Sequence, residues 1–129
     1  MMEKVRVLLF GEHSECRMAE NTIRQAAPFR EVHVEAICVD DLEELSKALV
    51  DWEPTLLVVT ADGAEGMESV YRSREQRPSV PVFWFSDDKD FGVLSYRLNC
   101  AYFSVKPVTE EKLNHAIQRC DHLGICCTT

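Results

Sequence analysis

Residues 55–86 read TLLVVTADGAEGMESVYRSREQRPSVPVFWFS, and this stretch decides the fold class. It opens with the apolar run Thr55–Val59 and closes with a second apolar run, Val82–Phe85. Between the runs, apolar residues recur at helical spacing from Met67 to Tyr71, and the helical pattern ends before Pro78. A strand, a helix and a second strand in this order predict a βαβ unit with two parallel strands.

The same alternation continues on both sides of this stretch. Further strands are predicted at Val5–Phe10, Glu31–Cys38 and Ala101–Val105. Further helices are predicted at 15–27, from Asp41 to Trp52, from Phe91 to Leu98 and from Thr109 to Cys120, with Asp41 and Thr109 as N-caps. The dipeptide Asp62-Gly63 predicts a turn. Five strands that alternate with five helices predict an α/β fold with helices on both faces of a parallel sheet.

The apolar character of each strand indicates its place in the sheet. The first, third and fourth strands are nearly continuous apolar runs, which is typical of central strands. The second strand alternates and carries Glu31 and Glu35, which favours an edge. Right-handed crossovers then predict a flavodoxin-like, doubly wound (βα)5 fold with the parallel strand order 2-1-3-4-5.

Length and composition fit a single small domain. The chain has 129 residues, of which 46% are hydrophobic and 28% charged, and we expect one domain over residues 1–122 and a short tail at 123–129. It contains no stretch of 18 apolar residues, and the run Val5–Phe10 is too short for a secretory signal, so we expect a cytoplasmic protein without membrane contact. The net charge of −8 argues against direct nucleic-acid binding.

The six cysteines favour reduced thiols over a disulfide framework. Cys16, Cys38 and Cys100 stand singly in apolar runs, and the other three lie near the C-terminal end. The terminal group lacks a paired Cys-x-x-Cys motif, so a zinc site is not expected there; its residues are Cys120, Cys126 and Cys127, with His115 and His122.

Chemistry in a sheet of this order is expected at the carboxyl ends of the strands. The side chains expected to meet there are Glu12, Thr60, Asp62, Ser86 and Lys106. They fit either a phosphate-handling site, with a donor from Ser86 and a cation from Lys106, or a polar rim around one buried ion pair of lysine and glutamate. No Ser–His–Asp arrangement and no glycine-rich phosphate loop is present, so we do not expect an enzyme.

Several motifs together resemble the receiver domains of bacterial two-component response regulators. Ser86 at the end of the fourth strand resembles the switch hydroxyl of that family, and Lys106-Pro107 resembles its Lys-Pro motif after the fifth strand. Phe103 stands at the position of its switch aromatic, and residues 90–103 look most like receivers of LytTR-type (AlgR/AgrA-like) transcription regulators. The resemblance covers about residues 4 to 121.

This resemblance implies a signalling module with protein partners, such as a sensor kinase or a second copy of the chain. It also implies that the chain is the N-terminal regulatory part of a transcription regulator. The expected output or dimer face contains Tyr96, Arg97 and Tyr102.

The sequence departs from that family where phosphorylation takes place. The family holds Mg²⁺ with two adjacent acidic residues, where this chain has Gly11 and Glu12, and Thr60 stands at the position of its phosphoacceptor aspartate. An acyl phosphate needs a carboxylate nucleophile and a cation, and Mg²⁺ needs oxygen ligands. We therefore predict a pseudo-receiver without standard aspartyl phosphorylation and without a cofactor.

Two alternatives stay open. One is a phosphorylatable receiver that uses Asp62, with Mg²⁺ held by Glu12 and Asp62. The other is a flavodoxin-like small-ligand sensor or enzyme that uses the same crevice. For the predicted pseudo-receiver, Lys106 is expected to pair with Glu12 or Asp62. Ser86 is expected to cap the helix that follows it, with Asp87 or Asp88 as competing caps, and Phe103 to be an ordinary core or edge aromatic.

Overall fold

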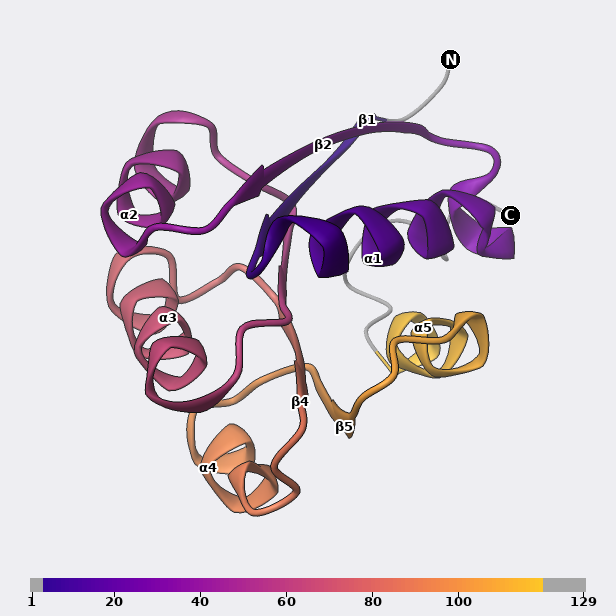
Figure 1. The fold of residues 1–129 in the computed structure, drawn as a ribbon. Helices are drawn as coiled ribbons and strands as arrows, with labels where there is room; N and C mark the ends of the chain where they lie inside the picture. The colour runs from indigo at the N-terminus through magenta and orange to yellow at the C-terminus, as the bar shows by residue number, and fades with distance from the viewer. Residues whose placement is uncertain (1–3, 120–129) are drawn as a thin grey trace.

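Five parallel strands form one sheet in the order β2-β1-β3-β4-β5 in the computed structural model, which describes residues 4–119 (Figure 1). The strands are β1 (Lys4–Phe10), β2 (His33–Val39), β3 (Leu56–Val59), β4 (Val82–Ser86) and β5 (Tyr102–Val105). All four pairs of neighbouring strands are parallel. The predicted fold class and strand order are therefore confirmed.

Helices cover both faces of the sheet within residues 4–119 (Figure 1). They are α1 (His13–Gln25), α2 (Leu42–Asp51), α3 (Gly63–Gln76), α4 (Phe91–Arg97) and α5 (Glu110–Gln118), with a short 3₁₀ turn, η1 (Ala27–Phe29), after α1. Helices α1 and α5 pack on one face, and α2, α3 and α4 pack on the other. The two layers of helices leave the carboxyl ends of the strands as the open edge where loops meet.

Alternation along each central strand divides the core in two. Val7 and Leu9 of β1 face α1 and α5, whereas Leu8 and Phe10 face α2 and α3. Strands β3 and β4 are buried along their whole length, and β2 is half-buried from Glu35 onward, as expected for central and edge strands. Both predicted N-caps are confirmed, since the side chains of Asp41 and Thr109 accept hydrogen bonds from the first turns of α2 and α5.

Two helices begin earlier than the sequence pattern predicts. Helix α1 begins at His13 rather than at residue 15, because Glu12 takes the N-cap position in an extended conformation. The predicted turn at Asp62-Gly63 is the start of α3, with Asp62 as its N-cap residue and Gly63 as its first residue. The chain therefore passes from β3 to α3 over only three residues, and this short connection carries Asp62 toward the edge of the sheet.

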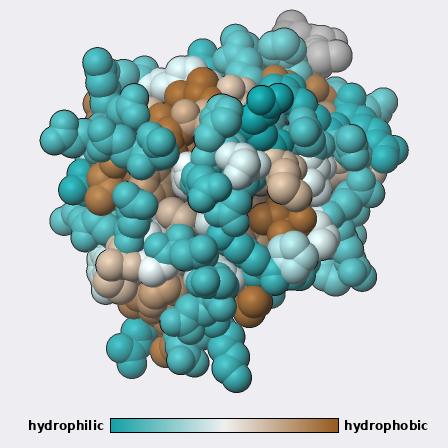
Figure 2. Space-filling model, viewed as in Figure 1, coloured by the Kyte–Doolittle hydropathy of each residue, from teal (hydrophilic) through white to brown (hydrophobic). Residues whose placement is uncertain are grey.

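Hydrophilic side chains dominate the face of the molecule in Figure 2, with small hydrophobic patches between them. In the described part of the chain, no helix is long and apolar enough to span a membrane. The predicted boundary at residue 122 lies outside the described residues, as do His122 and the cysteines at 120, 126 and 127.

Candidate functional site

The side chain of Lys106, directly after β5, is the centre of the candidate site. Its ammonium Nζ lies 2.6 Å from Glu15 Oε2 and 3.1 Å from the carboxylate of Asp62. The lysine side chain is only 15% exposed, whereas those of Glu15 and Asp62 are 38% and 43% exposed. Three segments that are distant in sequence, the first turn of α1, the N-cap of α3 and the end of β5, are thus joined through one ammonium group.

The charge of Lys106 is stabilised in this position. Burial acts to lower its pKa, but the hydrogen bonds and ion pairs with Glu15 and Asp62 outweigh burial, so the pKa of Lys106 is raised above its ordinary value. The ammonium therefore stays charged, and two carboxylates surround it. The three groups together carry a net charge of −1, which disfavours binding of a further anion at Nζ.

The prediction that Lys106 pairs with Glu12 or Asp62 is confirmed by the contact with Asp62. Glu12 is not a partner of the lysine. Glu12 is exposed, and its carboxylate accepts a hydrogen bond of 2.9 Å from the hydroxyl of Ser14. Glu15, one helical turn further on, takes the second place beside Lys106. The signal in the sequence is its position in the first turn after the central strand β1, which faces the crevice.

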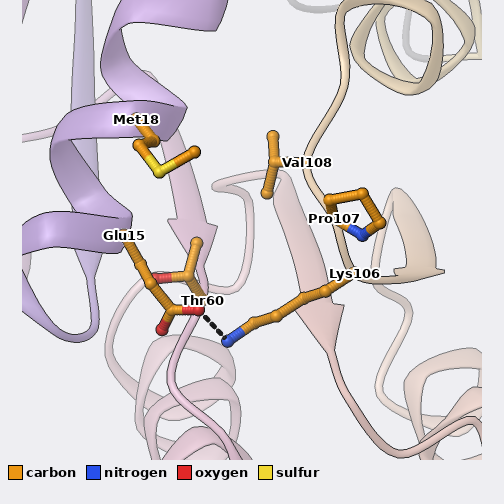
Figure 3. Close-up of a pocket in the computed structure, with 6 residues that line it drawn as sticks. All are labelled: Glu15, Met18, Thr60, Lys106, Pro107 and Val108. Atoms are coloured by element: carbon orange, nitrogen blue, oxygen red, sulfur yellow. Dashed lines mark hydrogen bonds and ion pairs between the residues drawn. The ribbon is translucent and has the colours of Figure 1, made fainter.

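A small pocket opens beside this cluster (Figure 3). It has a volume of about 300 Å³ and is lined by Glu15, Met18, Thr60, Lys106, Pro107 and Val108. Figure 3 shows the lysine reaching toward Glu15 and Thr60, with Met18 above Glu15 on α1 and with Pro107 and Val108 on the side of Lys106. The walls are apolar and the ion pair lies at the bottom.

Thr60 fills the space at the end of β3 and excludes a side chain from position 11. It is fully buried, and its hydroxyl donates a hydrogen bond of 3.4 Å to the carbonyl of Phe10. A Cβ atom on Gly11 would lie 2.2 Å from Thr60 Oγ1, and Gly11 has a φ of +156°. A second carboxylate at position 11 is therefore incompatible with Thr60 in this arrangement.

The residues present do not fit a magnesium site of the kind the family resemblance implies. Among residues 4–119, no group of three or more histidine, cysteine or carboxylate side chains lies close enough together to hold a metal ion. The two weak candidates are separately engaged, Glu12 with Ser14 and Asp62 with Lys106. Mg²⁺ needs near-octahedral oxygen coordination, usually from one or two carboxylates free to bind it.

Asp62 and Ser86 hold the loop after β4 in place. Asp62 Oδ1 accepts a hydrogen bond of 3.1 Å from the backbone amide of Asp87. Ser86 is fully buried, and its hydroxyl accepts a bond of 3.0 Å from the amide of Asp88. The prediction that Ser86 caps α4 is wrong, because the helix begins later, with Asp90 as its N-cap. The serine stabilises the turn that precedes the helix.

The aromatic residues near β4 and β5 form a packed group. The buried ring of Trp84 stacks on Phe91 at a centroid distance of 5.1 Å and meets the edge of Phe103 at 5.6 Å. Phe103 itself is half-buried. Of the residues predicted for the output face, Tyr96 is 84% exposed and Arg97 is exposed, while Tyr102 is half-buried beside Phe83 and Phe85.

Comparison with solved structures identifies the fold. The response regulator receiver domain protein of Clostridium thermocellum is similar with a TM-score of 0.71 and 17% identity, covering 92% of this chain and 98% of its own. A LuxR-family two-component response regulator of Aurantimonas has a TM-score of 0.72 and 17% identity, covering 95% of this chain and 86% of its own. The CpaE2 pilus assembly protein of Sinorhizobium meliloti has a TM-score of 0.70 and 20% identity, covering 90% of this chain and 99% of its own.

This is the fold of a receiver domain. At these identities the likeness concerns the fold alone. No protein-family model matches the sequence, and no curated protein matches it either. The chemistry of this receiver fold therefore depends on the residues of its own site.

Proposed function

We propose that this chain is a receiver-like signalling module that works by binding other proteins, without standard aspartyl phosphorylation. The observation that supports this proposal is the environment of Lys106. Its ammonium is already paired with two carboxylates, at 2.6 Å and 3.1 Å, at the place where a phosphoryl group would need a free cation. The ion-pair cluster then joins α1, α3 and the end of β5 in the free protein, and the module favours one conformation until a partner binds.

The end of β3 supports the same proposal. Thr60 offers a hydroxyl where a carboxylate nucleophile is needed, and it fills the space beside Gly11 that a metal-binding carboxylate would need. A neutral hydroxyl cannot replace an ionised carboxylate as the acceptor that forms an acyl phosphate, or as a ligand that offsets the charge of Mg²⁺.

The test is phosphorylation by acetyl phosphate with Mg²⁺, followed by intact mass spectrometry. A phosphorylatable response regulator receiver in the same reaction shows that the phosphodonor works. We expect this chain to show no gain of one phosphate. A Mg²⁺-dependent gain that is lost in Asp62→Asn, but kept in the matched variant Asp87→Asn, would overturn the proposal.

One alternative has a specific observation in its favour. Asp62 is turned toward Lys106 at 3.1 Å, which is the kind of contact that a phosphoacceptor beside a catalytic cation needs. A phosphorylatable receiver that uses Asp62 is therefore the second candidate. Against it, Glu12 faces Ser14 and solvent and supplies no second metal ligand beside Asp62. The phosphorylation experiment separates the two candidates directly.

A small-ligand sensor is the third candidate, and the pocket of about 300 Å³ beside Lys106 favours it. Small-ligand sites are concave and mostly apolar with a few polar groups, and Met18, Pro107 and Val108 provide apolar walls here. Native mass spectrometry of the purified chain would detect a retained ligand. A stoichiometric small molecule that is lost in Val108→Glu would favour this candidate over a protein-binding module.

The proposed module contacts its partners through the face that contains Tyr96, Arg97 and Tyr102. Tyr96 and Arg97 are exposed and Tyr102 is half-buried. Tyrosine and arginine side chains suit the centre of an interface, since they bury a large area and still make directed hydrogen bonds. We propose that the partner is a protein, such as a sensor kinase or a second copy, in the cytoplasm. We also propose that residues 1–122 form the regulatory part of a LytTR-type transcription regulator, with the tail at 123–129 outside that domain.

A further inference from the structure

A pair of cysteines lies directly behind the candidate site. Cys16 in α1 is fully buried, and Cys38 in β2 is half-buried and packs against the same core cluster. Each thiol acts on the pKa of the other. Together with their packing in one core cluster, this places the two side chains close together across the boundary between α1 and the edge strand of the sheet.

A surface pocket gives small molecules access to one member of the pair. Cys38 lines a pocket of about 250 Å³ at the carboxyl end of β2, together with Gly11, His13, Val39, Asp40 and Glu44. Cys16 is fully buried and does not line this pocket. One thiol is thus open to a reagent, and the other is placed to displace that reagent afterwards.

We propose that Cys16 and Cys38 form a reversible intramolecular disulfide when the protein meets a low-molecular-weight disulfide such as oxidised glutathione. This inference goes beyond the proposed signalling function and does not depend on it. The oxidised pair links the first turn of α1 to β2 covalently.

The reaction proceeds by two thiol–disulfide exchanges. The thiolate of Cys38, after losing its proton to solvent, attacks one sulfur of oxidised glutathione, forms a mixed disulfide and releases one glutathione thiolate. The thiolate of Cys16, also deprotonated, then attacks the Cys38 sulfur and releases the second glutathione thiolate. Two protein thiols are oxidised, and one glutathione disulfide is reduced to two thiols.

The surroundings of the two thiols set this order and a slow rate. Burial raises the pKa of Cys16 to about 12. Burial also raises the pKa of Cys38, but the hydrogen bond from Cys16 and the nearby charge of Arg17 act in the opposite direction, while Glu20 raises it further. Cys38 is therefore the thiol that reacts first. Formation of the Cys16–Cys38 disulfide is favoured by the proximity of the second sulfur and not by a high thiolate content.

The position of the pair connects it to the ion-pair cluster. Glu15, which binds Lys106, is the residue before Cys16. Thr60, the residue that fills the end of β3, also acts on the Cys16 thiol and lowers its pKa, although burial outweighs this effect. A disulfide would join the first turn of α1 to β2, so we expect oxidation to alter the first turn of α1, which also carries Glu15.

The test uses the full chain with the other four cysteines replaced, in the variant Cys100→Ser, Cys120→Ser, Cys126→Ser, Cys127→Ser. This variant is incubated with excess oxidised glutathione at mildly alkaline pH and then unfolded. Its free thiols are alkylated, and its mass is measured by mass spectrometry. We expect conversion to a species that has lost two hydrogens and takes up no alkylating reagent, and recovery of both alkylation sites after reduction. Adding Cys38→Ser to this variant should leave one alkylatable thiol and no bound glutathione.

Two results would overturn the proposal: both thiols remain alkylatable after prolonged oxidation, or the reaction stops with glutathione bound to Cys38. If the four-fold variant does not fold, the wild-type chain answers the question after trypsin digestion. Cleavage after arginine and lysine places Cys16 in residues 7–17 and Cys38 in residues 31–47. A disulfide-linked pair of these two peptides supports the proposal, and its absence from the oxidised protein contradicts it.

Discussion

Replacing Gly11 with alanine tests the claim that Thr60 has taken the space of a second carboxylate. The added Cβ atom would lie 2.2 Å from Thr60 Oγ1 and 3.0 Å from the backbone nitrogen of Ala61, at a residue whose φ is +156°. A strained backbone conformation costs about 1–3 kcal/mol and overpacking about 1–3 kcal/mol. We therefore expect Gly11→Ala to lower the free energy of unfolding by about 2–6 kcal/mol, a large part of the ~5–15 kcal/mol typical of a domain.

The assay is urea-induced unfolding followed by tryptophan fluorescence, since Trp84 is fully buried in the native fold. The steric part of the cost is tested with a double-mutant cycle. Thr60→Ala removes Oγ1, so the double variant Gly11→Ala, Thr60→Ala should lose about 1–3 kcal/mol less than the sum of the two single variants. The contact with the Ala61 nitrogen remains in the double variant, so rescue should be incomplete.

Gly92→Ala is the matched control. A Cβ atom there would meet only the ring of Phe103, at an ordinary contact distance of 3.7 Å. Gly92 is the second residue of α4, and alanine loses less conformational entropy than glycine in a helix, so we expect Gly92→Ala to leave stability unchanged or slightly higher. The reasoning is refuted if Gly11→Ala unfolds at the wild-type urea concentration, or if the cycle with Thr60→Ala shows no coupling.

The remaining predictions concern the ion-pair cluster and the exposed face. Lys106→Met should lower the free energy of unfolding at neutral pH by about 1–2 kcal/mol. The loss is modest because the two ion pairs of Lys106 are partly exposed to solvent. Because folding raises the pKa of Lys106, its contribution is complete below the unfolded pKa of about 10.4 and is lost as pH rises through the folded value, so urea unfolding of wild type and Lys106→Met should converge at high pH. Glu15→Gln should cost about 0.5–1 kcal/mol and Glu12→Gln close to nothing in the same assay, and equal losses would contradict the assignment of the lysine's partner. The variant Tyr96→Ala, Tyr102→Ala should weaken self-association or partner capture in sedimentation and pull-down, and unchanged association in a folded variant would place the output on another surface.

Much of this fold is determined locally, and so it can be predicted from the sequence. Continuous apolar runs such as Leu56–Val59 cannot be stable unless both faces are covered, and alternation with helical patterns leaves few arrangements of a parallel sheet. The same logic places Thr60 and Lys106 at the carboxyl ends of their strands, because a residue that follows a strand lies at that edge of the sheet. The sheet order and the location of the candidate site followed from these patterns alone.

Which side chains meet at that edge was decided only by the tertiary structure. Glu12 and Glu15 are both acidic and one helical turn apart, and the extended conformation of Glu12 at the N-cap leaves Glu15 to face Lys106. That contact joins residues 91 positions apart, so it depends on how α1 packs against the sheet next to the end of β5. The contact of Cys16 with Cys38 depends on the same packing. Sequence patterns report burial and secondary structure along the chain, whereas the direction of a charged side chain depends on the packing of elements that are far apart in sequence.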